Sequence, residues 1–271
     1  MTKRWLAFTG AFLFTASVAQ ADVAPGDLFS ACEKGDAEAA VRIVHAGVDA
    51  KARDTTGNTA LHYAARSYNR ALIDWLVKSG VKIGLTNAQG RTALHEAAAL
   101  ANLSAASALI GNHANLESRT AKGDTPLHLA AQSLSAEAVK IIEFFLESGA
   151  NVNSTNFQGE TPFFLSCEAA FPDTELLDAR IEKGGEAVPR DSLAVPAFLI
   201  SSGADLQIRN VDGETALFRA AALGKSRLMK FLVETGANVN VTNRIGVTIL
   251  ETAKRKGDDE SVRLLLDAGA R

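Results

Sequence analysis

The hydrophobic residues of this chain follow a pattern typical of pairs of short amphipathic helices. A first apolar stretch, such as TALHYAARS at 59–67, begins with threonine and contains two adjacent alanines. A second stretch, such as KIIEFFLESG at 140–149, places apolar residues three and four positions apart and stops at glycine. This spacing aligns apolar side chains along one side of a helix. We therefore expect an all-α fold built from helix pairs.

Threonine and proline residues mark where the first helix of each pair is expected to begin. Threonine is a good N-cap because its hydroxyl accepts a hydrogen bond from the first turn. Proline suits the first helical position, where its missing N–H costs nothing, and Pro126 and Pro162 each follow a threonine. The threonines that recur at this position are Thr59, Thr92, Thr125, Thr161, Thr215 and Thr248.

Glycines in two columns show that the chain is built from an internal repeat. Those of the first column lie in turns where glycine accepts a positive φ: Gly57, Gly90, Gly123, Gly159, Gly213 and Gly246. Their spacing is constant except on either side of Gly159, where both intervals are longer. The second column ends each unit in phrases such as SGANVN: Gly47, Gly80, Gly149, Gly203, Gly236 and Gly269. In the third unit residues 112–114 fill this place without a glycine.

A period of about 33 residues, with phrases such as TPLHLAA and GANVN, resembles the ankyrin-repeat family. The resemblance implies an all-α ankyrin-repeat solenoid of about seven helix–turn–helix units with β-hairpin-like turns. We expect this ankyrin-repeat domain to span residues 22–271. Its units are expected at 23–53, 54–86, 87–119, 120–155, 156–209, 210–242 and 243–271, with the first and last acting as caps.

The fifth unit carries a long insertion, at 171–192, after its first helix. Apolar residues would lie on one side of a short helix over 173–183, which Gly184 and Gly185 would end. The fourth unit is longer by three residues at the same helix–helix turn, so both additions are expected to form one protrusion. Two interpretations stay open: a tolerated surface insertion, or an element that docks a partner.

Three histidines, His62, His95 and His128, recur at the same place in three consecutive units. Equivalent positions in neighbouring helices lie about 8–10 Å apart, whereas zinc holds each ligand nitrogen at about 2 Å. The three rings therefore cannot share a metal ion. We predict a structural role, in which each histidine is hydrogen-bonded to the threonine three residues earlier and to the adjoining turn. Phe164 and Phe218 are expected to fill the same slot by packing alone.

The first 21 residues have the layout of a cleaved secretory signal peptide. A basic pair at 3–4 precedes an apolar run at 5–18, and AQA at 19–21 forms an A-x-A cleavage site. The run is too short to span a membrane comfortably, so we favour a cleaved signal over an N-terminal anchor, and over a lipid on Cys32. We predict cleavage after Ala21 and a periplasmic or secreted protein.

Charge and motifs argue against a nucleic-acid binder and against an enzyme. With 28 basic and 31 acidic residues, the chain lacks the basic excess of nucleic-acid-binding domains. It contains no GxSxG, no phosphate-binding glycine loop and no Cys/His cluster with metal spacing. We therefore predict no catalytic residue, no metal and no cofactor. Cys32 and Cys167 lie four units apart, too far for a disulfide, and are expected to be buried thiols.

The family resemblance implies a binding surface on the concave side, formed by the hairpin tips and by exposed positions of the first helices. Aromatic and arginine side chains are common anchors of protein interfaces. The resemblance assigns these partner-binding residues: Tyr63, Arg66, Arg91, Glu96, Lys122, Phe157, Glu160, Asp212, Arg219 and Arg244.

From these features we predict a non-enzymatic protein–protein interaction module that acts in the bacterial periplasm. Its partner is expected to be another protein of the cell envelope, with no nucleic acid and no stable membrane insertion, and the chain is expected to be a monomer. Two more specific functions stay open. One is self-protective inhibition of an envelope enzyme, such as one that cleaves peptidoglycan, and the other is a scaffold in envelope stress defence.

Overall fold

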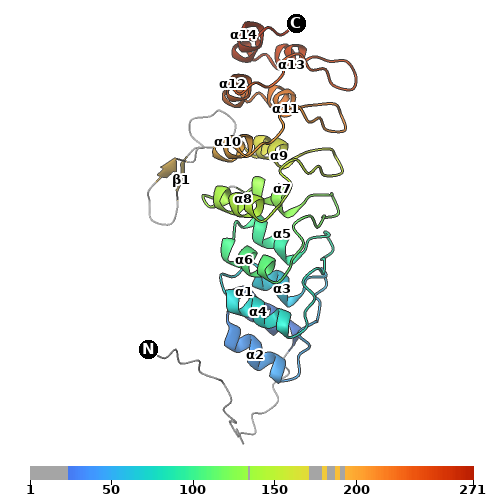
Figure 1. Ribbon diagram of the computed structural model, residues 1–271, viewed down its shortest axis with the longest axis vertical. Helices are drawn as coiled ribbons and strands as arrows, with labels where there is room; N and C mark the ends of the chain where they lie inside the picture. The colour runs from blue at the N-terminus through green and yellow to red at the C-terminus, as the bar shows by residue number, and fades with distance from the viewer. Residues whose placement is uncertain (1–23, 134, 171–178, 182–186, 190–192) are drawn as a thin grey trace, which may run out of the picture.

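The computed structural model describes residues 24–133, 135–170, 179–181, 187–189 and 193–271 (Figure 1). Within these residues fourteen helices and two short strands are assigned. The helices form pairs that stack along the long axis of the molecule, and the loops between successive pairs project from one side of the stack. The all-α solenoid predicted from the repeat pattern is therefore confirmed.

Two layers of helices make up the stack. We call the helices beside the projecting loops inner helices and their partners outer helices. Each inner helix packs against the next inner helix along the whole length of the stack. The inner helices are α1 (Pro25–Lys34), α3 (Ala60–Ala64), α5 (Ala93–Ala99), α7 (Pro126–Ala131), α9 (Pro162–Ala169), α11 (Ala216–Leu223) and α13 (Ile249–Lys256). The outer helices are α2 (Ala37–His45), α4 (Arg70–Lys78), α6 (Leu103–Gly111), α8 (Ala138–Glu147), α10 (Ala194–Ser201), α12 (Ser226–Glu234) and α14 (Asp259–Asp267).

The hydrophobic core lies between the two layers and between consecutive repeats. Ala64 and Ala65, at the end of α3, are fully buried because their small side chains allow the outer helix to approach. Leu72, Ile73 and Leu76 of α4 are fully buried on the facing side. Burial of one such leucine or isoleucine contributes about 1.5–3 kcal/mol, so each repeat is stabilised mainly by its contacts within the stack.

The loops between helix pairs form a continuous hydrogen-bonded edge. They comprise six hairpins, at 54–58, 87–91, 120–124, 156–160, 210–214 and 243–247, and each one after the first donates a backbone N–H to a carbonyl of the hairpin before it. These bonds are Ala88 to Thr56 at 2.8 Å, Ala121 to Gln89 at 2.9 Å, Phe157 to Lys122 at 3.0 Å, Val211 to Gln158 at 2.8 Å and Arg244 to Asp212 at 2.7 Å. The predicted β-hairpin-like turns are therefore present.

The hairpin glycines are required both by backbone conformation and by space. Gly90 has a φ of +73°, in the left-handed region where other residues are strained. A Cβ on Gly90 would also lie 2.5 Å from the backbone nitrogen of Ala121 in the next hairpin. In the second glycine column, the third repeat has His113 instead, which adopts a φ of +67°.

The described part of the insertion is a pair of strands, which corrects the predicted helix over 173–183. Strand β1 (Ala179–Ile181) pairs antiparallel with β2 (Ala187–Pro189), on the side of the stack away from the hairpins (Figure 1). The rest of that predicted helix lies outside the described residues. Gly184 and Gly185 were interpreted as a helix stop, but a Gly-Gly pair is equally typical of a hairpin turn between short strands.

Both cysteines are buried, as predicted. Cys32 lies in α1 and Cys167 in α9, four steps apart along the inner layer. Burial raises the pKa of each thiol to about 12. Since the thiolate is the reactive form, neither thiol is set up as a nucleophile at neutral pH.

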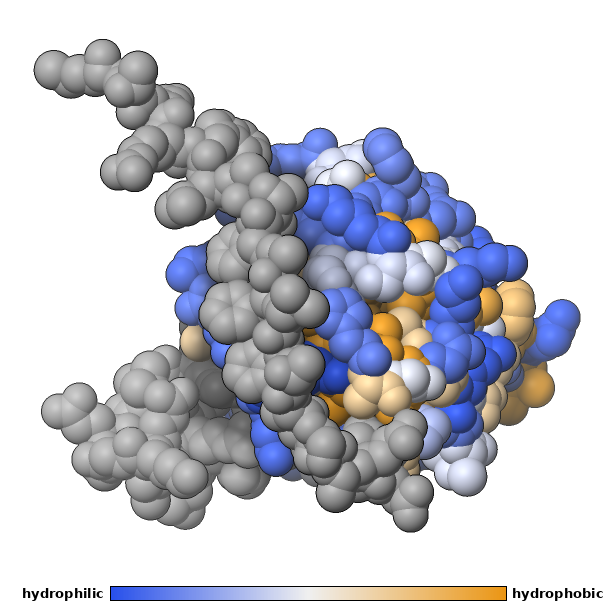
Figure 2. Space-filling view, turned by 90° about the horizontal axis from the view of Figure 1, so that it is seen from below, coloured by the Kyte–Doolittle hydropathy of each residue, from blue (hydrophilic) through white to orange (hydrophobic). Residues whose placement is uncertain are grey.

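The N-terminal end of the stack is formed by α1 and α2 (Figure 1). Viewed from this end, the surface carries hydrophilic and hydrophobic side chains side by side (Figure 2). The predicted signal peptide at 1–21 lies outside the described residues. In the part of the chain that the structure describes, no helix is both long enough and apolar enough to cross a bilayer.

Candidate functional site

Three buried histidines tie consecutive repeats together. Each Nδ1 accepts the backbone N–H of the threonine three residues earlier, at 3.1 Å in all three repeats. Each ring is therefore protonated at Nε2, which donates to a carbonyl of the next hairpin. These second bonds join His62 to Arg91 at 2.9 Å, His95 to Asp124 at 3.1 Å and His128 to Glu160 at 3.0 Å. The structural role predicted for the histidines is confirmed.

Burial keeps these imidazoles neutral. It lowers the pKa of His62 and His128, and it lowers the pKa of His95 to about 4, although the bond from Nε2 to a carbonyl opposes the shift. Because both nitrogens of each ring are engaged within the protein, neither is available to bind a metal or to accept a substrate proton.

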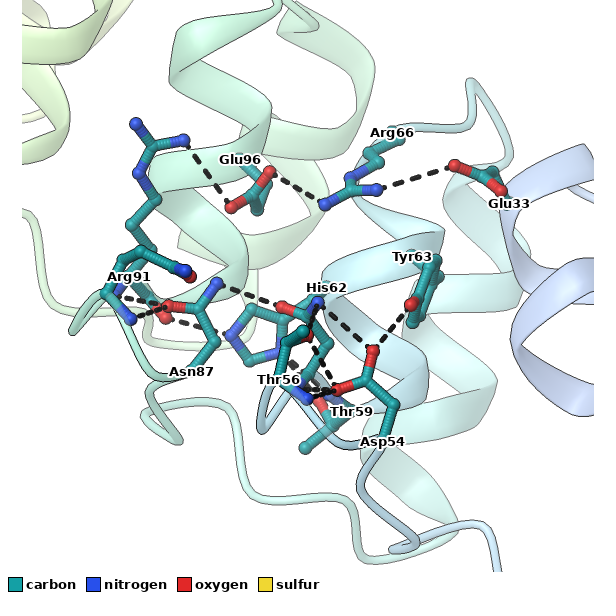
Figure 3. Close-up of polar contacts among 12 residues, drawn as sticks. Glu33, Asp54, Thr56, Thr59, His62, Tyr63, Arg66, Asn87, Arg91 and Glu96 are labelled. Carbon is teal, nitrogen blue, oxygen red and sulfur yellow. Dashed lines mark hydrogen bonds and ion pairs between the residues drawn. The ribbon is translucent and has the colours of Figure 1, made fainter. Parts of the chain in front are cut away.

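The candidate binding surface is the hairpin face, which we define as the six hairpins and the exposed sides of the inner helices. Tyr63 of α3 lies near the N-terminal end of the hairpin face, where its hydroxyl donates to Asp54 at 2.6 Å (Figure 3). This bond raises the pKa of the phenol. The ring stacks on Phe29 of α1, with centroids 5.2 Å apart, and the Arg66 guanidinium lies 5.2 Å from its centroid, within range of a cation–π attraction. Tyr63 is therefore held on three sides.

A row of alternating charges connects Tyr63 and Arg66 to the next repeat. Arg66 pairs with Glu33 at 3.4 Å and with Glu96 at 3.3 Å, and Glu96 also faces Arg91 at 3.8 Å (Figure 3). Glu96 was predicted at an exposed position, but it is only 7% exposed. The structure corrects this: the carboxylate lies beneath the two arginines and orients them, so a partner would meet the arginines.

Buried amide bonds fix the hairpins relative to one another. Asn87 donates through Nδ2 to Asn58 Oδ1 at 2.9 Å, which joins the first two hairpins. Asn156 donates in the same way to Asp124 Oδ1 at 2.8 Å, which joins the third and fourth. Since buried polar groups that are hydrogen-bonded specify one arrangement, the hairpin face is ordered before any partner arrives.

A cavity of about 510 Å³ opens on the hairpin face between the third and fourth hairpins. Phe157, at the tip of the fourth hairpin, is 63% exposed and lines this cavity together with Lys122 and Glu160. The Phe157 ring lies against the preceding hairpin, since a Cβ on Gly123 would be 2.7 Å from its Cδ1 atom. Three predicted residues are thus brought together around one cavity.

The remaining predicted residues lie further along the stack. Arg219 of α11 forms ion pairs with Glu168 at 2.6 Å and with Glu214 at 3.4 Å. Burial alone would lower the pKa of Arg219, but its acidic neighbours raise it overall. Asp212 and Arg244 are exposed on the fifth and sixth hairpins. The predicted residues therefore form two groups, one of charged residues and Tyr63 near the N-terminal end and one around the cavity. Asp212, Arg219 and Arg244 belong to neither group.

Three residues of the hairpin face were missed by sequence reasoning. Glu168 lines the cavity and binds Arg219; it occupies the same position in its repeat as Arg66, so the repeat register alone would have found it. Val211 and Ile245 are exposed apolar residues on the fifth and sixth hairpins. Ile245 could have been found from the sequence, because the other five hairpins have a polar residue directly before the glycine.

Solved structures with a similar fold include the ankyrin repeat domain of Bcl-3, described as a unique member of the IkappaB protein family. Its TM-score to this chain is 0.68, with 23% sequence identity, and the match covers 89% of this chain and 97% of that chain. At this identity the likeness concerns the fold alone. No curated protein sequence matches the chain.

A family model describing ankyrin repeats in three copies matches residues 28–119, 98–178 and 186–271. The gap between the last two matches falls within the insertion at 171–192. Ankyrin repeats are protein–protein interaction modules, which agrees with an ordered face of hairpins and helices. The matched segments span most of the chain, and the chain belongs to the ankyrin-repeat family.

Proposed function

We propose that this protein binds another protein through its hairpin face after export to the bacterial periplasm. The observation that carries the proposal is the series of apolar side chains on the last three hairpins. Phe157 and Ile245 are 63% and 81% exposed, and Val211 is exposed on the hairpin between them. Large apolar side chains gathered along one exposed edge mark an interaction surface.

The proposed mechanism is non-covalent occupancy of a partner by a preordered surface. The backbone bonds between hairpins and the buried amide bonds hold the tips in place. Binding to an ordered surface loses less conformational entropy than binding to mobile loops. Arg66 and Arg91 are oriented by Glu96 and add charged contacts at the other end of the face.

Protein capture tests the role of the hairpin face. The purified protein is immobilised, partners are captured from a cell-envelope extract, and the captured proteins are identified by mass spectrometry. Replacing Phe157 and Ile245 together by serine should abolish capture without changing the circular dichroism spectrum. Tyr68→Ser is the matched control, because Tyr68 is 77% exposed but lies on the loop between α3 and α4. Equal loss in both variants would refute binding by the hairpin face.

Export rests on the basic pair, apolar run and A-x-A site within residues 1–21. Protein isolated from its native cells should begin at Asp22 and be released with the periplasmic fraction. N-terminal sequencing measures this directly. An intact Met1, or a lipid attached to Cys32, would refute the proposed location while leaving the test of the hairpin face unaffected.

The identity and activity of the captured partner also distinguish inhibition of an envelope enzyme from a scaffold role in envelope stress defence. If the partner is an envelope hydrolase, its activity should fall as the purified protein is added, and the serine double variant should not inhibit it. If the partner keeps its activity in the complex, the role is that of a scaffold. Both outcomes are measured with the same assay of partner activity, on the purified protein mixed with its purified partner.

A further inference from the structure

We infer that the cavity between the third and fourth hairpins receives an arginine side chain of the partner protein. This inference rests on the proposed function and adds the chemistry of one contact. The cavity has a volume of about 510 Å³, within the range of about 300–1,000 Å³ typical of ligand pockets. It lies on the hairpin face, where Phe157 forms one wall. Gln132, directly after α7, also lines the cavity, together with Leu165 and Glu168 of α9.

Negative charge predominates in this cavity. Asp124, Glu160 and Glu168 line it, against the single cation Lys122. Arg219 lies beyond Glu168, but it is also paired with a further carboxylate, that of Glu214. When Arg219 and Glu214 are included, the cavity and its surroundings contain two cationic and four carboxylate side chains. A cationic ligand group is therefore favoured, since opposite charges attract strongly in a partly enclosed site.

Asp124 provides a second, independent indication of a hydrogen-bond donor in the ligand. Asp124 lines the cavity although the residue is only 7% exposed. Oδ1 accepts a bond from Asn156 at 2.8 Å, and among the described residues none donates to Oδ2. A buried carboxylate oxygen without a donor is costly, and a guanidinium N–H entering the cavity would satisfy it.

The aromatic wall favours arginine over lysine. The flat guanidinium stacks on aromatic rings and donates two parallel hydrogen bonds to a carboxylate, whereas an ammonium does neither as well. Phe157 presents such a ring, held against Gly123. Glu160 has no ion pair among the described residues, and its carboxylate accepts only the Asn156 amide at 2.9 Å, so it retains capacity for further bonds.

Titration with short peptides tests this inference on the isolated protein. The full-length protein, labelled with ¹⁵N, is titrated with acetyl-Gly-Gly-Arg-Gly-Gly-amide and followed by two-dimensional NMR. Saturable amide shifts should be confined to residues around the cavity, such as Phe157 and Glu160. The peptide with citrulline in place of arginine has the same shape without the charge, and it should bind about tenfold more weakly or worse.

Variants with opposite expected effects separate a binding role from a structural one. Glu160→Gln should weaken arginine binding about tenfold, and Phe157→Ala about threefold. Lys122→Gln removes the opposing charge and should strengthen binding about twofold to threefold. Glu143→Gln is the matched control, because it removes an exposed carboxylate from the outer helix α8, away from the hairpin face, and it should change the affinity less than twofold. Thermal melting checks that each variant is folded.

The outcomes distinguish this inference from the proposed function. The arginine assignment would be overturned if the citrulline peptide bound as tightly as the arginine peptide. It would also be overturned if Lys122→Gln and Glu160→Gln changed the affinity in the same direction. If the peptide does not bind but capture of the partner still requires Phe157, the proposed function stands and the arginine assignment falls. If the peptide binds as expected and no partner is captured, the preference of the cavity for arginine stands, but the proposed function falls and with it the assignment of that arginine to a partner protein.

Discussion

At the scale of single residues, one position in the inner helices shows how a side chain connects or fails to connect two repeats. His62, His95 and His128 bond both to their own N-cap threonine and to the next hairpin. In the last repeat Glu251 occupies this position and accepts only the N–H of Thr248, at 2.8 Å. Phe164 and Phe218 are buried there and fill the space without a side-chain hydrogen bond. Among the described repeats that are followed by a further hairpin, those with histidine at this position form the side-chain bond across repeats and those with phenylalanine do not.

The buried histidines should make the stability of the fold fall with decreasing pH. The pKa of His95 is lowered to about 4 in the folded state, whereas an exposed histidine in the unfolded chain titrates near 6.5. The unfolded state therefore binds the proton first, and the contribution of His95 is complete above about pH 6.5 and is lost between about pH 6.5 and 4. Urea unfolding measured across this range should show the decrease.

His95→Phe gives the comparison for this prediction, because phenylalanine occupies the same position in later repeats. At pH 7.5 the variant should be less stable by about 1–3 kcal/mol, the cost of lost buried hydrogen bonds. Its free energy of unfolding should fall less steeply than that of the native protein between pH 6.5 and 4. Parallel curves for the two proteins would show that carboxylates alone set the pH dependence.

His113 offers a substitution that should stabilise the protein. It is exposed and adopts a φ of +67° where the other repeats have glycine. A left-handed conformation costs a residue other than glycine about 1 kcal/mol. His113→Gly should therefore raise the free energy of unfolding by about that amount in urea melts. Gly80→Ala, at the same place one repeat earlier with a φ of +87°, should lower it, and two changes of the same sign would contradict the argument.

At the scale of elements, the end of α9 is held from another repeat. Lys225, at the start of α12, donates through Nζ to the carbonyls of Cys167 at 3.1 Å and Glu168 at 2.6 Å, and to that of Ala170. Asn102 performs the same task three repeats earlier, with bonds to carbonyls at the end of α3. The longer lysine reaches the last carbonyls of α9, and a cation at a helix C-terminus is favoured by the helix dipole.

Lys225→Met should therefore destabilise the junction between α9 and α12. Methionine keeps much of the buried apolar stem but removes the charged donor, so the free energy of unfolding should fall by about 2–3 kcal/mol. Lys230→Met makes the same chemical change at an exposed position of α12 and should have little effect. Similar urea midpoints for the two variants would contradict a capping role for Lys225.

The insertion should be dispensable for folding. The carbonyls of Cys167, Glu168 and Ala170, which accept hydrogen bonds from Lys225, precede residues 172–192. Shortening 172–192 to an ordinary helix–helix turn leaves these carbonyls in place. Repeat arrays are stabilised by contacts between neighbouring repeats, so the shortened protein should keep its circular dichroism spectrum and a cooperative thermal transition. Loss of the transition would show that 172–192 completes the core. Loss of partner capture by a folded variant would assign the insertion a docking role.

At the scale of the whole molecule, the bonds between repeats are unevenly distributed. Histidine side chains connect α3, α5 and α7 to the following hairpins, but Phe164 in α9 and Phe218 in α11 make no such bond. Stability in a repeat array is approximately a sum over repeats and interfaces. The C-terminal repeats should therefore open more readily than the central ones.

Hydrogen exchange measures this difference directly. Backbone amides of α11 and α13 should exchange faster than those of α5 and α7 at pH 7.5, because their local unfolding costs less free energy. Phe218→His would place an imidazole beside Thr215, as in the histidine repeats, and should slow exchange in α11. Uniform protection from α5 to α13 would show that apolar packing outweighs the histidine bonds.

The repeat architecture could be predicted because its signals are local. The threonine N-caps, the positive φ of Gly57 and Gly90 and the buried Ala64–Ala65 pair depend on residues within one unit. The roles of the histidines also followed, because the threonine partner lies only three residues away. The pattern failed in the insertion, where a short apolar stretch was compatible with helix and with strand, and pairing with β2 decided the outcome.

The sequence by itself determined the ankyrin class, the order of the helices and the hairpin positions, because caps, glycines and apolar spacing act over a few residues. Only the tertiary structure decided which residues of the hairpin face are available. Glu96 is buried by arginines 5 and 30 positions away, Arg219 is held by Glu168 from 51 positions away, and the cavity beside Phe157 exists only between two stacked hairpins. Stacking sets exposure and pairing because each repeat is completed by its neighbours.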